Sequence, residues 1–158
     1  MKIRKATVDD AASIAILGAD IQQMHHEQRP DWFKPANDKT TVEMYREMLT
    51  NAAFTVYIAE EGKEPLGFVA AVVHQRPHTP LGWAQTVLEV DQIGVAPSAR
   101  RRGVGHALFT VVRELADEVS ADRIGLTTWV FNFDAHRFFE AEGLETEMLR
   151  MSMPRSSH

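Results

Sequence analysis

The stretch from Val95 to His106, which reads VAPSARRRGVGH, most constrains what this chain can form. It follows an apolar run, contains three successive arginines and two spaced glycines, and precedes a long helical pattern. Free amides at a helix N-terminus carry partial positive charge and attract anions. Glycines, which have no Cβ, let a phosphate approach the backbone closely. The order strand, basic loop, helix therefore predicts a phosphate-binding turn, with an ordinary solvated loop as the alternative.

Charge and cysteine content narrow the function classes. The 158 residues suffice for one domain with a sizeable core. A formal net charge of -5 argues against a general nucleic-acid binder, so the arginines indicate a local anion site. The absence of cysteine excludes disulfides and thiolate chemistry. Because no signal peptide or membrane-length apolar run is evident, we expect a cytoplasmic protein without a membrane partner.

Helical spacing dominates the first third of the chain. Thr7 and Asp10 form an N-cap signal, and the apolar residues of the helix that follows are Ile14, Leu17, Ile21 and Met24. Thr40 with Glu43 predicts the start of a second helix. Residues 25–35, between two helical patterns, carry two histidines and two large aromatics, and we expect an irregular segment there. We expect no metal site, because the two histidines are adjacent and lack a third ligand.

Strand patterns follow. Residues 54–58 alternate in polarity and residues 66–73 are nearly all apolar, which predicts a β-hairpin. A strand over 84–95 leads into the basic loop, and a helix begins at Val104. A further apolar strand over 124–131 implies a right-handed parallel crossover.

The end of the chain completes one domain. A fourth helix runs from about Phe133 to Glu142 and stops at Gly143, a helix C-terminal signal. We expect a weak final strand over 144–153 and a disordered tail over 154–158. The prediction is a single mixed α/β (α+β) domain over residues 1–153, with about four helices flanking a central sheet.

Two carboxylates lie in the strand before the basic loop. By simple alternation, one face of this strand comprises Val87, Glu89, Asp91, Ile93 and Val95. A carboxylate among apolar residues beside an anion site is suited to general-base work. The alternative is that this end of the strand is solvated, or that the carboxylates pair with arginines.

The fourth helix carries a second group of residues. One side of this helix comprises Asn132, Ala135, His136, Phe139 and Gly143. Asn132 is foremost a helix N-cap, and with the small Ala135 it could also line a groove. His136 is most simply a solvated histidine.

These motifs, in this order, resemble the GCN5-related N-acetyltransferases (GNAT). The resemblance rests on the patterns Ile93-x-Val95-x-Pro97, Arg100-x-x-Gly103-x-Gly105 and Asn132-x-x-Ala135-x-x-x-Phe139-x-x-x-Gly143-Leu144. The element order fits over nearly the whole chain, and the specific motifs lie between Glu89 and Leu144. The resemblance implies a mixed, mostly antiparallel sheet that splays between its fourth and fifth strands, with acetyl-CoA in the opening and no metal.

The same resemblance implies site residues. Backbone groups of Ile93, Gly94 and Val95 would hold the pantetheine arm and thioester. The pyrophosphate cradle would comprise Arg100, Arg101, Arg102, Gly103, Val104, Gly105 and His106. Asn132 would hydrogen-bond the donor, Ala135 would leave room for it, and Phe139 would line the same site.

The implied reaction is direct attack of a primary amine on the thioester. An alkyl ammonium has a pKa of about 10.4, so it must lose a proton first. Glu89 and Asp91 both match positions of the family's carboxylate base, which often acts through water, and we favour Glu89 slightly. Phe139 occupies the position of a tyrosine that protonates the departing thiolate in many members. His136, Tyr57 or water would then have to supply that proton.

The sequence is also compatible with two other functions. Because Phe139 cannot donate a proton, the chain could be a non-catalytic acyl-CoA-binding or regulatory domain. The arginine cluster could instead bind RNA or a phosphorylated partner, which the acidic composition disfavours. The sequence does not identify the amine, which could belong to a small molecule or a peptide, and a homodimer is possible.

Overall fold

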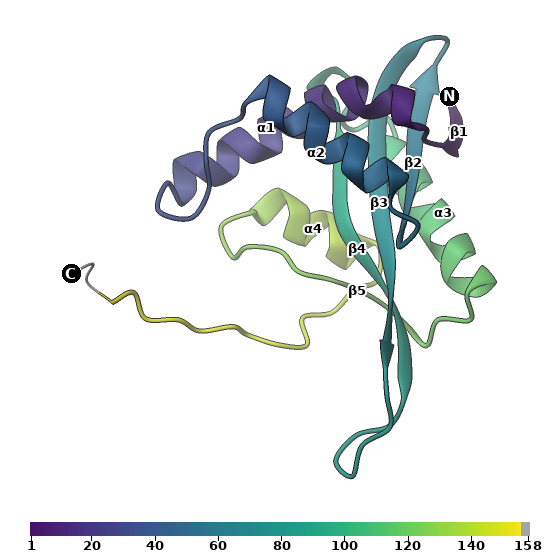
Figure 1. Ribbon diagram of the computed structural model, residues 1–158, viewed down its shortest axis with the longest axis vertical. Helices are drawn as coiled ribbons and strands as arrows, with labels where there is room; N and C mark the ends of the chain where they lie inside the picture. Colours follow the sequence, from purple (N-terminus) through teal and green to yellow (C-terminus); the bar gives the residue numbers. More distant parts are fainter. Residues whose placement is uncertain (156–158) are drawn as a thin grey trace. The chain divides into compact units, whose positions relative to one another are not determined.

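The computed structural model describes residues 1–155, which form two compact units (Figure 1). The first unit comprises Met1–Thr127, and the second begins at Thr128. Of the predicted tail 154–158, residues 154–155 have no regular secondary structure and the rest lie outside the described residues. No helix within residues 1–155 is both long and apolar enough to cross a membrane.

The first unit is a five-stranded sheet with helices on both faces. Its strands are β1 (Lys2–Lys5), β2 (Phe54–Glu61), β3 (Glu64–Arg76), β4 (Gln85–Val95) and β5 (Arg123–Leu126). Its helices are α1 (Ala11–Gln28), α2 (Asp38–Thr50) and α3 (Val104–Glu118), with short 3₁₀ turns η1 (Val8–Asp10) and η2 (Pro97–Ala99). The strands lie in sequence order, antiparallel from β1 to β4, and β5 is parallel to β4. The predicted mixed, mostly antiparallel sheet is confirmed.

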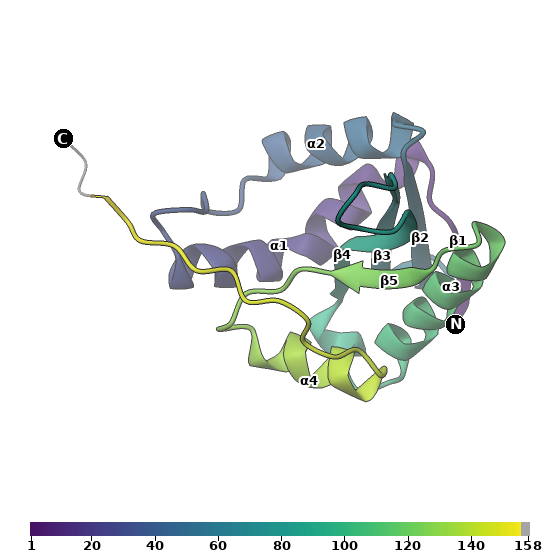
Figure 2. The same cartoon turned by 90° about the horizontal axis from the view of Figure 1, so that it is seen from below.

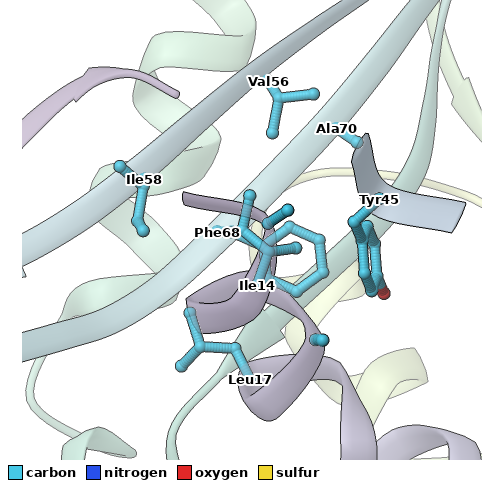
Figure 3. Close-up of a cluster of buried hydrophobic side chains, with 9 residues drawn as sticks. Ile14, Leu17, Tyr45, Val56, Ile58, Phe68 and Ala70 are labelled. Atoms are coloured by element: carbon cyan, nitrogen blue, oxygen red, sulfur yellow. The ribbon is translucent and has the colours of Figure 1, made fainter. Parts of the chain in front are cut away.

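Alternation along the strands decides which helix packs on which face. Phe68 and Ala70 of β3 point to the side of α1 and α2, where they join Ile14 and Tyr45 in a buried cluster (Figure 3). On the other face, the position of a Cβ on Gly67 lies only 3.1 Å from Leu108 of α3. Helices α1 and α2 therefore cover one face and α3 the other (Figure 2).

Element ends differ from the sequence prediction where tertiary contacts set them. Helix α2 begins at Asp38, two residues before the expected Thr40, because the Asn37 side chain caps it by accepting from the Thr40 amide at 3.2 Å. Helix α1 continues through Gln28, into the segment expected to be irregular. Strand β5 ends at Leu126 and not at residue 131, since only residues 123–126 pair with β4.

The second unit contains helix α4 (Phe133–Ala141). The helix is capped by Asn132 and followed by Gly143 at φ 89°, as the sequence predicts. The predicted strand over 144–153 is wrong, because in the described part of the chain these residues pair with no strand. An extended segment becomes a strand only when a neighbour pairs with its backbone. The large apolar side chains left exposed here are Met148, Leu149, Met151 and Met153.

Candidate functional site

Strand β4 carries one extra residue at Asp91. Ala70 of β3 pairs with Gln92, whereas the next residue, Ala71, pairs with Val90. Asp91 therefore has no partner in the β3–β4 ladder, which is a β-bulge. Such bulges bend a strand and redirect its side chains.

The bulge reverses the faces of the β4 side chains that follow it. Judged by their β3 partners, the residues pointing to the α1/α2 face are Val87, Glu89, Gln92 and Gly94. Ile93 and Val95 pair with Val69 and Gly67 and point to the α3 face. The prediction that Glu89 shares a face with Ile93 and Val95 is wrong, because an inserted residue shifts the period of two.

Glu89 is partly exposed and has a histidine neighbour. Its side chain is 40% exposed, and its Oε2 lies 3.3 Å from Nε2 of His74 on β3. Asp91 is exposed, and within the described residues it makes no ion pair. The alternative that these carboxylates pair with arginines does not describe Glu89, whose partner is His74.

A buried tyrosine meets β4 next to the bulge. The Tyr45 hydroxyl donates a 2.6 Å hydrogen bond to Oε1 of Gln92, and Tyr45 is only 3% exposed. Burial, with a smaller contribution from the charge of Asp91, raises the pKa of Tyr45 to about 12. The sequence patterns do not single out Tyr45, Gln92 or His74 as site residues. The one signal was an amide, Gln92, within an otherwise apolar strand end.

The pairing of β4 with β5 stops at the bulge. The last pair is Val90 with Leu126, and β4 then continues to Val95 with no strand of the described residues on that side. The predicted opening between the fourth and fifth strands is thereby confirmed. Within the described residues, backbone groups of residues 93–95 have no ladder partner on this edge. Unpaired groups at a strand edge are generally available to extended ligands.

The basic loop has the backbone of an anion-binding turn. Arg101 has φ 59° and Gly103 has φ 81°, and α3 begins directly after Gly103. The first amides of α3, from Val104 onward, have no acceptor within the helix itself. Two arginines face carboxylates: Arg102 lies 2.9 Å from Glu61, and Arg100 lies 3.8 Å from Asp20.

Arg101 has no ion pair within the described residues, so its charge is the least compensated of the three arginines. The predicted order of strand, basic loop and helix is confirmed, and the ligand stays a prediction.

The predicted residues of α4 lie in the second unit. Asn132 Oδ1 accepts from the Ala135 amide at 3.2 Å, so the N-cap interpretation is confirmed. His136 Nε2 lies 3.1 Å from the Trp129 carbonyl oxygen. Phe139 is buried and packs edge-to-face on Phe138, with ring centroids 5.2 Å apart. The role of Asn132, Ala135 and Phe139 in binding a donor stays a prediction.

The position of Tyr57 argues against it as a proton donor at this site. Tyr57 pairs with Val69 and therefore points to the α3 face, opposite Glu89. Burial, and then the charges of Glu118 and Glu114 of α3, raise the pKa of Tyr57.

Comparison with known proteins gives matches in sequence and in structure. The model of the acetyltransferase (GNAT) family matches residues 21–144. The uncharacterized N-acetyltransferase YhfO of Bacillus subtilis is 27% identical over 93% of this chain and 91% of its own length.

Solved structures share the fold. A tetramutant of the BH1408 protein from Bacillus halodurans superposes with a TM-score of 0.92 at 22% identity, over 98% of this chain and 100% of that one. The aminoglycoside N-acetyltransferase AAC(6')-Iy, solved with CoA, has a TM-score of 0.72 at 18% identity, over 99% and 95% of the two chains.

Proposed function

The chain belongs to the acetyltransferase (GNAT) family, and from this membership we propose that it transfers an acetyl group from acetyl-CoA to a primary amine. The observation that carries the proposal is the position of Glu89, one residue before the last β4–β5 pair. A carboxylate there lies between two parts of β4: the part after Val90, which has no β5 partner, and the part before it, which leads back to the tip of the β3–β4 hairpin. A base and a donor edge are thus adjacent on one strand.

We assign the donor to the open edge and the basic turn. Backbone groups of residues 93–95 would hold the pantetheine arm along the unpaired edge. The amides and arginines of residues 100–106 would hold the pyrophosphate at the start of α3, where the positive φ of Gly103 turns the chain into the helix. Bound there, acetyl-CoA would supply an acetyl group activated as a thioester.

Gly94 serves packing more than ligand approach. A Cβ on Gly94 would lie 2.8 Å from Phe68 Cε1 and 3.2 Å from the Leu17 carbonyl oxygen. Its small size therefore lets α1 pack closely on β4 and keeps the edge in place. For the second unit, the family motif implies donor-binding roles for Asn132, Ala135 and Phe139 of α4, and these roles stay predictions.

Glu89 is our first choice of general base and Asp91 the second. Glu89 points to the α1/α2 face and is half-exposed, so it can take a proton from an ammonium group, directly or through water. The neutral amine then attacks the thioester carbonyl carbon without an acyl-enzyme intermediate. Since a thiol has a pKa of about 8.5, the thiolate can depart without a protein acid. The attacking nitrogen loses its second proton as the amide forms, this proton passes through water to the thiolate, and Phe139 need not donate one.

We propose a small cationic amine as the acceptor. Glu89 and Asp91 place negative charge beside the reacting position, which favours cations. Two solved proteins of the same fold are aminoglycoside acetyltransferases, which supports a small-molecule amine as the first class to try.

The test is CoA release from acetyl-CoA, measured with a panel of aminoglycosides, polyamines, amino acids and peptides. We expect turnover with at least one amine. Glu89→Gln should lower kcat by about 10²-fold or more, Asp91→Asn should lower it less, and exposed Glu43→Gln serves as the control. Full activity of the double variant of Glu89 and Asp91 would contradict the base assignment.

The non-catalytic alternative predicts a different result. This alternative is favoured by Phe139, which stands where many members of the family have a proton-donating tyrosine. Tight CoA binding with no turnover on any amine would support this acyl-CoA-binding function and overturn the enzymatic one.

A further inference from the structure

His74 and Glu89 form a pair across the β3–β4 hairpin. His74 is opposite Val87 and Glu89 is opposite Val72, so the two side chains are diagonal neighbours on the same face. Their closest atoms, Nε2 and Oε2, are 3.3 Å apart. His74 is 51% exposed, more than the 40% of Glu89. The imidazole is thus in contact with both the carboxylate and water.

The two residues of the pair lie at different distances from the hairpin tip. Glu89 is followed by the bulge and the open edge of β4, whereas His74 lies two positions nearer the hairpin tip. The long β3–β4 hairpin extends past the other strands of the sheet (Figure 1). In the proposed reaction, the acceptor amine approaches Glu89 from the side of the open edge. His74 lies on the other side of Glu89, toward the hairpin tip.

Other charged groups on this face belong to neighbouring positions. Arg76 follows His74 by two residues on β3, and Arg123 of β5 pairs with Val87, so both share the face of Glu89. Asp91 lies at the bulge. An arginine stays protonated near neutral pH and cannot accept a proton from a carboxylic acid. An imidazole can, because its ordinary pKa is about 6.5.

We propose that His74 carries to solvent the proton that Glu89 takes from the acceptor amine, an inference that rests on the proposed acetyl transfer. The Glu89 carboxylate takes a proton from the ammonium nitrogen, which leaves a neutral amine and a carboxylic acid. The acid O–H gives this proton to Nε2 of neutral His74, and the carboxylate is restored. The imidazolium loses a proton from Nδ1 to water, and exchange with water returns the starting tautomer. His74 is a positioning and relay residue, because it acts through Glu89.

Chemical rescue separates this role from a structural one. In saturating acetyl-CoA and amine, His74→Ala should lower kcat by about tenfold, less than the 10²-fold or more expected for a general base itself. Added imidazole should restore kcat of His74→Ala in proportion to its concentration and leave the KM for the amine unchanged. Wild-type protein should show no such dependence. The matched control is His78→Ala, another exposed histidine at the hairpin tip.

The outcomes distinguish the relay from the proposed function. Unchanged kcat in His74→Ala, or a loss that imidazole does not restore, overturns the relay while acetyl transfer by wild-type protein stands. If imidazole does not raise kcat of the double variant His74→Ala with Glu89→Gln, the relay is supported, since the imidazole then has no acid to deprotonate. No turnover by wild-type protein on any amine overturns both proposals.

Discussion

The hydroxyl of Tyr45 on α2 and the side-chain oxygen of Gln92 on β4 are 2.6 Å apart, within a hydrogen bond that crosses from helix to sheet. It meets β4 immediately after the bulged Asp91. The aromatic ring packs edge-to-face on Phe68, within a cluster of buried hydrophobic side chains (Figure 3). One side chain thereby fixes both the position of α2 and the part of β4 where the proposed donor edge begins.

Removing that hydroxyl should cost stability. In Tyr45→Phe, Gln92 Oε1 loses its donor in a mostly buried place, so we expect a fall of about 1 kcal/mol in the free energy of unfolding. Urea titration followed by circular dichroism measures it. The control is Tyr57→Phe, because Tyr57 makes no side-chain hydrogen bond within the described residues. Equal stability of the two variants would mean that the Tyr45 hydrogen bond adds nothing.

Gly94 should tolerate no side chain. In Gly94→Ala the new Cβ meets Phe68 Cε1 at 2.8 Å and the Leu17 carbonyl at 3.2 Å, so either α1 or the sheet must shift. We expect a loss of about 1–3 kcal/mol, the usual cost of overpacking. The same substitution at Gly82, where the nearest atom lies 3.5 Å away, should be close to neutral. Thermal unfolding of both variants checks this, and similar melting temperatures would contradict it.

Much of the fold was predictable, because local periodicity and caps agree with it. The hairpin of β2 and β3, the basic loop and α3 follow from alternation, turn residues and a helical stripe, which depend on neighbours in sequence. The cap at Asn132 is likewise a local signal. The strand over 144–153 was not predictable in this way, since its existence depends on a partner strand and not on its own pattern.

The site was harder to predict because its key contacts are long-range. Alternation assigned Glu89 and Ile93 to one face, and a single unpaired residue, Asp91, separates them. Nothing in the local sequence marks that insertion. The contact of Tyr45 with Gln92 joins residues 47 positions apart, and His74 reaches Glu89 only through the register of the hairpin.

Gly103 should matter for both stability and donor binding. With φ at 81°, Gly103→Ala is strained by about 1–2 kcal/mol, and it distorts the turn that presents the first amides of α3. We expect isothermal titration calorimetry to show weaker CoA binding in Gly103→Ala. Arg101→Gln, which removes a positive charge, should show a smaller loss of CoA affinity. Gly143→Ala, at φ 89°, carries similar strain and should leave CoA affinity unchanged. Unaltered affinity in Gly103→Ala would exclude the turn as the pyrophosphate site.

The Arg4–Asp10 pair should make stability depend on acid. The Arg4 guanidinium donates two 2.8 Å hydrogen bonds to Asp10, and this contact, with the Thr7 amide, lowers the pKa of Asp10 to about 2. Since the ordinary pKa is near 3.8, the contribution is present above pH 4 and is lost as the pH falls toward 2. The shift corresponds to about 2 kcal/mol.

Asp10→Asn should therefore lose about this amount at pH 7 and show a shallower fall in stability between pH 4 and pH 2 than the wild-type protein. Asp31→Asn is the matched control, because Asp31 also pairs with an arginine, Arg29, at 2.8 Å but is 60% exposed. Its removal should not change the unfolding free energy measurably, since exposed ion pairs are screened by water. Guanidinium unfolding at each pH gives both values. A parallel pH dependence in Asp10→Asn and wild-type protein would show that the acid sensitivity arises from other carboxylates.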